Sequence, residues 1–225
     1  TYDSQLNPIH SLMIDTLLTN GEYIGLSTMI AVDDGLVLVG RNRSYPFIMK
    51  LDNNLEPVWS HTFNGLDSSA FLDIKQTLDG GLICSGLGDL LRLNTLGDSL
   101  WVYEATTPVT AILEIVVRTD GTYYVHGEFG GGNRSIMRFD DNGTYLGGYP
   151  YTLPGEYNRS GRSFIESTDH QLVILKARFS GFSIDWEEYG MLHKVAPSGN
   201  VIWSNIFLQH PNQYDVGLGR NPIFI

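Results

Sequence analysis

Residues 79–86 read Asp-Gly-Gly-Leu-Ile-Cys-Ser-Gly, an acidic turn with glycines followed by a short apolar stretch that ends in glycine. The same pattern recurs, with some residues replaced, at 33–40, 120–127 and 169–176. Self-similarity at a spacing of about 20 to 50 residues is typical of an array or ring of repeated units. The chain is therefore expected to contain about four imperfect copies of one unit.

The second half of each copy has a fixed spacing. A basic residue ending an apolar stretch is followed nine positions later by Trp, or once by Gly: Lys50 and Trp59, Arg92 and Trp101, Arg138 and Gly147, Lys194 and Trp203. Polar turns separate the members of each pair, as hairpins require. Each copy is predicted to be a four-stranded antiparallel meander, with the strands of the second copy at 71–77, 82–86, 90–93 and 99–103. The periodic Trp residues are interpreted as packing between copies.

A single sheet of this kind cannot bury both faces, so neighbouring sheets are expected to stack, and radial stacking gives a β-propeller. The predicted fold class is all-β, with one propeller domain over residues 1–225. The predicted blades, in chain order, cover residues 21–65, 66–107, 108–152 and 153–209. Residues 1–20 and 210–225 are expected to be partial or ring-closing strands. A closed five-bladed ring and a part of a larger propeller both remain open.

Two segments carry a resemblance to a known family. Residues 76–81 (Gln-Thr-Leu-Asp-Gly-Gly) precede a stretch that ends at Gly86, and residues 50–54 (Lys-Leu-Asp-Asn-Asn) lead to Trp59. They resemble the DGG-type tandem repeats of secreted bacterial β-propeller proteins, especially those exported by Bacteroidetes, over roughly residues 25–208. The resemblance implies an extracellular or cell-surface protein. It implies no particular activity, because the matching residues build turns and packing.

Composition excludes several classes of function. The chain has 25 acidic and 14 basic residues, a formal charge of −11, and no concentrated basic run, so a nucleic-acid partner is not expected. No apolar run approaches the roughly 18 residues of a membrane helix, so no transmembrane segment is predicted. Cys84 is the single cysteine, which rules out an intramolecular disulfide. It is interpreted as a small core residue.

Strand direction separates the loops of a meander into two sets. The first and third turns of each sheet share one end, and the second turns share the other end with the connections between sheets. The second turns and connections vary most in sequence, so binding is expected there. The longest candidate is the segment 178–190, whose candidate binding residues are Arg178, Phe179, Phe182, Asp185, Trp186, Glu187 and Tyr189. The second candidate is the connection 153–162, with Tyr157, Arg159 and Arg162. Folding of the long loop over its own aromatic residues is the alternative.

No catalytic residue, metal ligand or cofactor is predicted. Asp185, Glu187 and Glu188 lie on one loop, whereas a glycosidase holds two carboxylates on opposite sides of a bond. The six histidines show no metal-binding spacing. The sequence therefore favours a non-enzymatic, exported or cell-surface module that binds a protein or glycan through its variable loops. A propeller-fold carbohydrate-active enzyme and a structural subunit of a larger surface assembly remain as alternatives.

Overall fold

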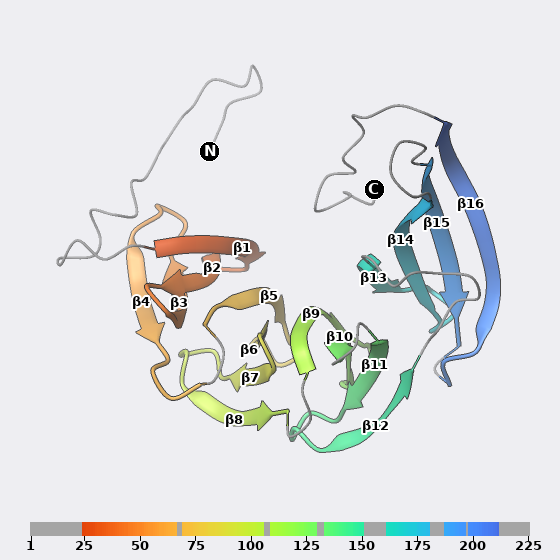
Figure 1. Ribbon diagram of the computed structural model, residues 1–225. Coiled ribbons are helices and arrows are strands. Elements are labelled where there is room, and N and C mark those ends of the chain that lie inside the picture. Colours follow the sequence, from red (N-terminus) through yellow and green to blue (C-terminus); the bar gives the residue numbers. More distant parts are fainter. Residues whose placement is uncertain are drawn as a thin grey trace. The chain divides into compact units, whose positions relative to one another are not determined.

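A computed structural model describes residues 24–66, 69–105, 109–129, 133–150, 161–180, 187–196 and 198–211. Within these ranges the chain has sixteen strands and no helix (Figure 1). The strands form four antiparallel four-stranded sheets, and in each sheet they follow one another in chain order. The predicted all-β fold of four-stranded meanders is therefore confirmed.

The strand bounds show where the repeats lie. The first sheet comprises β1 (Ile24–Val32), β2 (Gly35–Asn42), β3 (Tyr45–Leu51) and β4 (Pro57–Thr62). The second comprises β5 (Phe71–Gln76), β6 (Leu82–Gly86), β7 (Asp89–Leu93) and β8 (Ser99–Glu104). The third comprises β9 (Val109–Val117), β10 (Tyr123–Phe129), β11 (Asn133–Phe139) and β12 (Tyr145–Pro150). The fourth comprises β13 (Gly161–Glu166), β14 (Leu172–Ser180), β15 (Glu187–Val195) and β16 (Val201–Pro211). The four strands predicted for the second copy match β5 to β8 to within one residue at each end.

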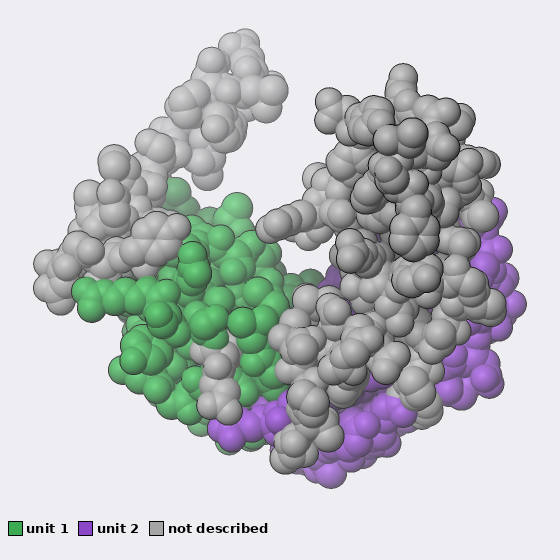
Figure 2. All heavy atoms as spheres, in the orientation of Figure 1, with its two compact units in different colours: residues 1–102 green, residues 103–225 purple. Residues whose placement is uncertain are grey.

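The chain divides into two compact units, residues 1–102 and 103–225 (Figure 2). In the first unit, a core of apolar side chains joins the first and second sheets: Val37, Val39, Ile48, Phe71, Ile74, Leu82, Cys84, Leu91 and Leu93. In the second unit, a core joins the third and fourth sheets: Val116, Tyr124, Ile136, Phe164, Leu172, Ile174 and Val195. Each unit thus contains a seam between two sheets, and burial of these apolar faces holds the seam together.

Strand register explains the nine-residue spacing of the sequence. Lys50 lies directly opposite Trp59, and Lys194 lies directly opposite Trp203, on the third and fourth strands of their sheets. A register shift follows one position later, at the end of the third strand. The third turn therefore has the same length in these sheets, which keeps the spacing constant. Trp59 packs against the core of the first unit, as expected of a residue between sheets.

Seven turns share one hydrogen-bond pattern, and it accounts for the recurring glycines. In the turn that begins at Asn94, the Asn94 N–H donates to the Asp98 carbonyl (2.9 Å) and the Gly97 N–H donates to the Asn94 carbonyl (3.1 Å). The same two bonds recur in the turns that begin at Asp52, Thr77, Arg118, Asp140, Ser167 and Ala196. The fourth residue of each turn has a positive φ, which glycine adopts without strain. Leu55 (φ 66°) and His170 (φ 61°) hold this conformation where the repeat lacks glycine.

Gly97 has a second role, because its turn lies against the Trp59 indole of the neighbouring sheet. A Cβ added at Gly97 would lie 3.0 Å from Cε2 of Trp59, whereas a Cβ at Gly121 would meet nothing within 4 Å. Both glycines have φ near 80° to 90°. We expect Gly121→Ala to cost about 1 kcal/mol of unfolding free energy through backbone strain alone. We expect Gly97→Ala to cost about 1 kcal/mol more, since the Trp59 ring must move. Urea unfolding measures both, and equal losses would contradict the packing role of Gly97.

Candidate functional site

The long loop predicted at 178–190 is partly strand. Arg178 and Phe179 lie in β14, Glu187 and Tyr189 lie in β15, and the backbone of Arg178 is directly opposite that of Tyr189. The ladder continues to Ser180 and Glu187, so the expected loop boundaries were too wide and the connection is 181–186. The remaining candidates of this loop lie outside the described residues: Phe182, Asp185 and Trp186. Their binding role stays a prediction.

The second candidate segment is also shorter than predicted at its end. Arg162 belongs to β13, which begins at Gly161. Tyr157 and Arg159 lie outside the part of the chain that the structure describes. Within this candidate, the structure thus places the backbone of Gly161 and Arg162.

The second turns of the four sheets differ in length. They consist of residues 43–44, 87–88, 130–132 and 181–186, in chain order. The first and third turns, in contrast, repeat the hydrogen-bond pattern described above at seven positions. One end of the sheets is therefore built from nearly identical turns, whereas the segments that join second and third strands at the other end differ in length from sheet to sheet.

The recurring acidic and basic residues form ion pairs, which the sequence analysis did not predict. In three sheets, an ion pair joins the first turn to the end of the third strand. The pairs are Lys50 Nζ with Asp34 Oδ2 (2.8 Å), Arg92 Nη2 with Asp79 Oδ1 (2.6 Å) and Lys194 Nζ with Asp169 Oδ2 (2.5 Å). The partners are 16, 13 and 25 residues apart, because the second turn between them varies. A fixed-spacing pattern therefore does not reveal them. The signal that could reveal these pairs is an acidic residue in the first turn together with a basic residue at the end of the third strand.

The Asp79 pair is built around a buried guanidinium. The Arg92 side chain is 1% exposed and donates to both carboxylate oxygens of Asp79 and to the carbonyls of Leu82 and Leu93. Asp79 also accepts hydrogen bonds from Thr77 Oγ1 (2.7 Å) and from the Gly81 N–H (3.1 Å). The hydrogen bond from Thr77, together with those from Gly81 and Arg92, outweighs burial and lowers the pKa of Asp79 to about 2. This carboxylate is therefore ionised at neutral pH and holds its turn.

Asp169 occupies the equivalent place in the fourth sheet. Hydrogen bonds from Lys194 and then from Ser167 lower its pKa to about 2. Ser167 Oγ donates to Asp169 Oδ1 at 2.6 Å. Asp79 and Asp169 thus share one structural role, which is to stabilise the first turn in the ionised form.

Glu166 joins the third and fourth sheets within the second unit. Its Oε1 accepts hydrogen bonds from Nε (3.0 Å) and Nη2 (2.8 Å) of Arg118, and it lies 2.9 Å from Nδ1 of His170. Arg118 also lies over the Tyr124 ring, 4.9 Å from its centroid. Burial alone would raise the pKa of Glu166, but the hydrogen bonds from His170 and Arg118 outweigh it and lower the pKa. Glu166 is therefore a charged link between two sheets.

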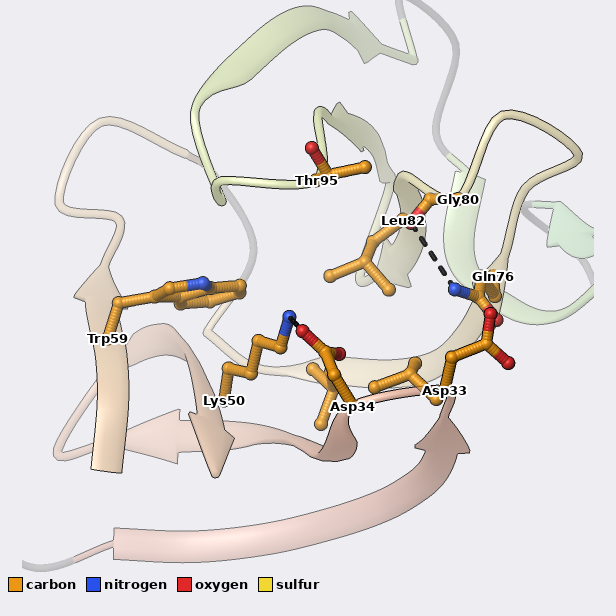
Figure 3. A pocket seen from close by; sticks show the side chains of 10 residues that line it. Asp33, Asp34, Lys50, Trp59, Gln76, Gly80, Leu82 and Thr95 are labelled. Atoms are coloured by element: carbon orange, nitrogen blue, oxygen red, sulfur yellow. Dashed lines mark hydrogen bonds and ion pairs between the residues drawn. The ribbon is translucent and has the colours of Figure 1, made fainter. Parts of the chain in front are cut away.

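One pocket lies between the first and second sheets of the first unit, at the end where the repeated turns are (Figure 3). Its volume is about 320 Å³, at the lower limit for a small-molecule site. Its polar and aromatic lining comes from both sheets: Asp33, Asp34, Lys50, Trp59, Gln76 and Thr95. Figure 3 shows the Lys50 ammonium directed at Asp34, with the Trp59 ring forming one wall. This pocket is at the opposite end of the sheets from the second turns, and each copy alone supplies only half of it.

Other chemical features of the described ranges are limited. Cys84 is a free thiol that is fully buried in the core of the first unit, which confirms the prediction of a core residue. Burial raises its pKa. Within the ranges that the structure describes, His, Cys, Asp and Glu residues form no group of three that could hold a metal ion. In the same ranges, no helix is long and apolar enough to cross a membrane.

No protein-family model and no curated protein matches the sequence. Among solved structures, the chain is similar to a protein of unknown function from Bacteroides caccae (14% identity, 75% of this chain and 57% of that one, TM-score 0.53). It is also similar to the Pan2 WD40 domain of Neurospora crassa (12% identity, 80% of this chain and 49% of that one, TM-score 0.54). A third is an exo-β-1,3-galactanase from Phanerochaete chrysosporium (9% identity, 79% of this chain and 48% of that one, TM-score 0.52).

The chain spans about half the length of these three structures. At such low identities the likeness shows the fold alone, and similar folds host unrelated functions. Four antiparallel four-stranded sheets together with these similarities give the fold class: the chain is a β-propeller protein built from four-stranded blades.

Proposed function

We propose that this chain is a non-enzymatic binding module that holds a protein or glycan partner at the end of its sheets where the second turns lie. The observation that carries this proposal is the contrast between the two ends of the sheets. Seven turns at one end repeat the same hydrogen bonds, while the second turns at the other end range from residues 43–44 to residues 181–186. Sites collect on loops that vary over a rigid scaffold.

Three of the described carboxylates with lowered pKa values serve the scaffold and are not candidates for a general acid. Asp79, Asp169 and Glu166 have lowered pKa values and are ionised at neutral pH. Each is hydrogen-bonded within a turn or between two sheets, and each thereby stabilises the scaffold. A general acid, in contrast, needs a raised pKa near the working pH.

We further propose that the protein is an exported or cell-surface propeller of the DGG-repeat type. The repeat at residues 76–86 supports this proposal, as does the similarity to a protein from Bacteroides caccae. The proposal includes both a protein and a glycan as the partner, because the fold similarity supports either one equally. A carbohydrate-active enzyme is the alternative, which the similarity to an exo-β-1,3-galactanase keeps open. The second alternative is a structural subunit of a larger surface assembly.

An exchange of turns tests the proposal without changing the scaffold. Residues 181–186 are replaced by the Arg-Ser turn of residues 43–44, which already joins a second strand to a third strand in this chain. The control changes the opposite end: residues 52–56 receive the sequence of residues 94–98, whose turn has the same hydrogen bonds. Partners are captured by cross-linking from surface and extracellular fractions, and on immobilised glycans, and their affinities are then measured.

We expect the wild type and the control to bind the same partner with equal affinity. The exchange at residues 181–186 is expected to weaken binding at least about tenfold, as loss of a few contact residues does, with an unchanged urea midpoint. Equal binding by all three proteins would contradict the placing of the site. Turnover of a bound glycan would support the enzyme instead.

A further inference from the structure

In the first unit, the second sheet covers a defined face of the first. The centre of that face is a row of directly paired residues across the four strands: Ile30, Val37, Lys50 and Trp59. Val37 is 1% exposed, and Ile30 and Trp59 pack against the core shared with the second sheet. The covering residues come from β5, β6 and β7: Phe71, Ile74, Leu82, Cys84, Leu91 and Leu93.

The second unit repeats this arrangement. On the third sheet, Val116 is paired with Tyr124, which is the equivalent row, and both are buried in the core shared with the fourth sheet. The fourth sheet contributes Phe164, Leu172, Ile174 and Val195 to that core. In both units, the face that carries this row is therefore the one that the next sheet of the chain covers.

The fourth sheet has the same row, and its residues match those of the first sheet in type. Ile165, Val173, Lys194 and Trp203 are directly paired across β13 to β16, as Ile30, Val37, Lys50 and Trp59 are across β1 to β4. Lys194 is bound to Asp169 as Lys50 is bound to Asp34. Alternate residues of a strand point to opposite faces, so Ile165 and Val173 point away from the third sheet, which Phe164 and Leu172 contact.

The two outer residues of this row are exposed on the fourth sheet. Ile165 is 39% exposed and Trp203 is 42% exposed, whereas their equivalents Ile30 and Trp59 are partly buried against a neighbouring sheet. A tryptophan and an isoleucine on one exposed sheet face are typical of an interaction surface. The part of the chain that the structure describes places no sheet against this face.

We propose that the exposed row on the fourth sheet is a docking face for a further four-stranded blade of this same repeat type. The covered face of the first sheet defines what such a blade needs. It needs apolar residues where the second sheet has Phe71, Leu82 and Leu93, and a glycine where it has Gly97, because a Cβ there would lie 3.0 Å from the tryptophan ring. A second copy of this chain fits less well, since its own Phe71, Leu82 and Leu93 are already buried against its first sheet.

The test supplies such a blade and measures whether it covers the face. A copy of residues 63–105 is added after Ile225 of the full chain. Ile165→Cys places a thiol in the exposed row, and Ile202→Cys places one on the opposite side of β16, where Ile202 is 53% exposed. Cys84 does not interfere, since it is fully buried, and its counterpart in the added copy is replaced by alanine. Rates of thiol modification are compared between the extended and the unextended chain.

We expect the added blade to slow modification at position 165 at least about tenfold and to leave position 202 within about twofold. A matched extension, with Asp at the positions of Leu82 and Leu93 in the added copy alone, is expected to give no protection. Equal rates at position 165 in all three proteins overturn the proposal when circular dichroism shows that the added blade is folded. Slow modification at position 165 in the unextended chain also overturns the proposal, because the face is then already covered. If the modification rate rises on dilution, a second copy of the chain covers the face. If the rate does not change on dilution, other segments of the same chain cover it.

A second measurement applies even if the added blade does not fold. On an open face, Trp203→Ser in the unextended chain should leave the urea midpoint unchanged, while the matched Trp59→Ser should lower it, because Trp59 packs against a core. If both substitutions lower the midpoint equally, the row is already packed in this chain and the proposal is wrong.

Discussion

Replacing Asp79 with alanine is expected to lower the free energy of unfolding by about 3 kcal/mol, because the buried Arg92 guanidinium loses its carboxylate. The Arg92 side chain is 1% exposed, so water replaces the lost partner only in part. The carbonyls of Leu82 and Leu93 remain as acceptors but carry no full charge. Asp79 itself is 59% exposed, and solvent screening places the loss at the lower end of the range for buried ion pairs. Urea unfolding followed by far-ultraviolet circular dichroism measures it.

Asp34→Ala is the matched control, since it removes the same ion pair from the first sheet. Lys50 there has a side chain that is 13% exposed, and Asp34 is 71% exposed, so water reaches both groups. The loss at Asp34 is expected to be clearly smaller than the loss at Asp79. Equal losses would mean that burial of the cation does not set the energy of these pairs.

The Asp79 pair also predicts a dependence on pH. The pKa of Asp79 falls from its ordinary 3.8 to about 2 on folding, so the unfolded chain binds the proton at a higher pH than the folded chain does. The stabilisation is therefore complete above the ordinary pKa and is lost as the pH falls towards 2. Between pH 5 and pH 2, wild type should lose more stability than Asp79→Asn, and their curves should converge at the acid end. Parallel curves would contradict this role of Asp79.

The fold could be predicted because its geometry imposes local rules on the sequence. A turn with a positive φ at its fourth residue selects glycine, as at Gly80 and Gly97. Direct pairing of Lys50 with Trp59 fixes their spacing. Leu55 and His170 mark the limit of such rules, because backbone hydrogen bonds keep the turn without glycine.

The ion pairs and the pocket could not be predicted from repeated motifs, because they form between segments whose separation varies. Asp79 and Arg92 meet across a hairpin, and the second turn sets how far apart they are in sequence. The pocket is lined by Trp59 from one sheet and Thr95 from the next. The sequence pattern of a single copy therefore does not reveal the pocket.

The predicted binding segments differ from the structure for a related reason. Residues 178–180 and 187–190 vary in sequence, yet strand pairing continues through them, since backbone hydrogen bonds tolerate most side chains. Trp59 and Trp203 show the converse. They have the same register and partner but different exposure, because burial depends on a neighbouring sheet and not on the residue itself.

Glu166→Ala is expected to destabilise the second unit by about 3 kcal/mol, because it removes the ion pair with Arg118 that joins the third and fourth sheets. Arg118 and Glu166 have side chains that are 9% and 11% exposed, so the loss leaves a poorly hydrated cation. Asp120, at 3.3 Å from Nη1 of Arg118, compensates in part. His170→Ala is the control: His170 is 61% exposed and contacts the same Glu166 oxygen, so its loss should cost less than about 1 kcal/mol.

Glu166→Gln tests how much of this stabilisation comes from the charge of Glu166, because glutamine has nearly the same shape but is neutral. The amide keeps one oxygen that can accept a hydrogen bond from Arg118 but removes the negative charge, so the loss is expected to lie between those of His170→Ala and Glu166→Ala. Because the pKa of Glu166 is lowered in the folded chain, acid should reduce the stability of wild type and leave Glu166→Gln less affected. If Glu166→Gln is as stable as wild type at neutral pH, the link between these sheets is a matter of packing around Phe164 and Tyr124, and its charge contributes nothing.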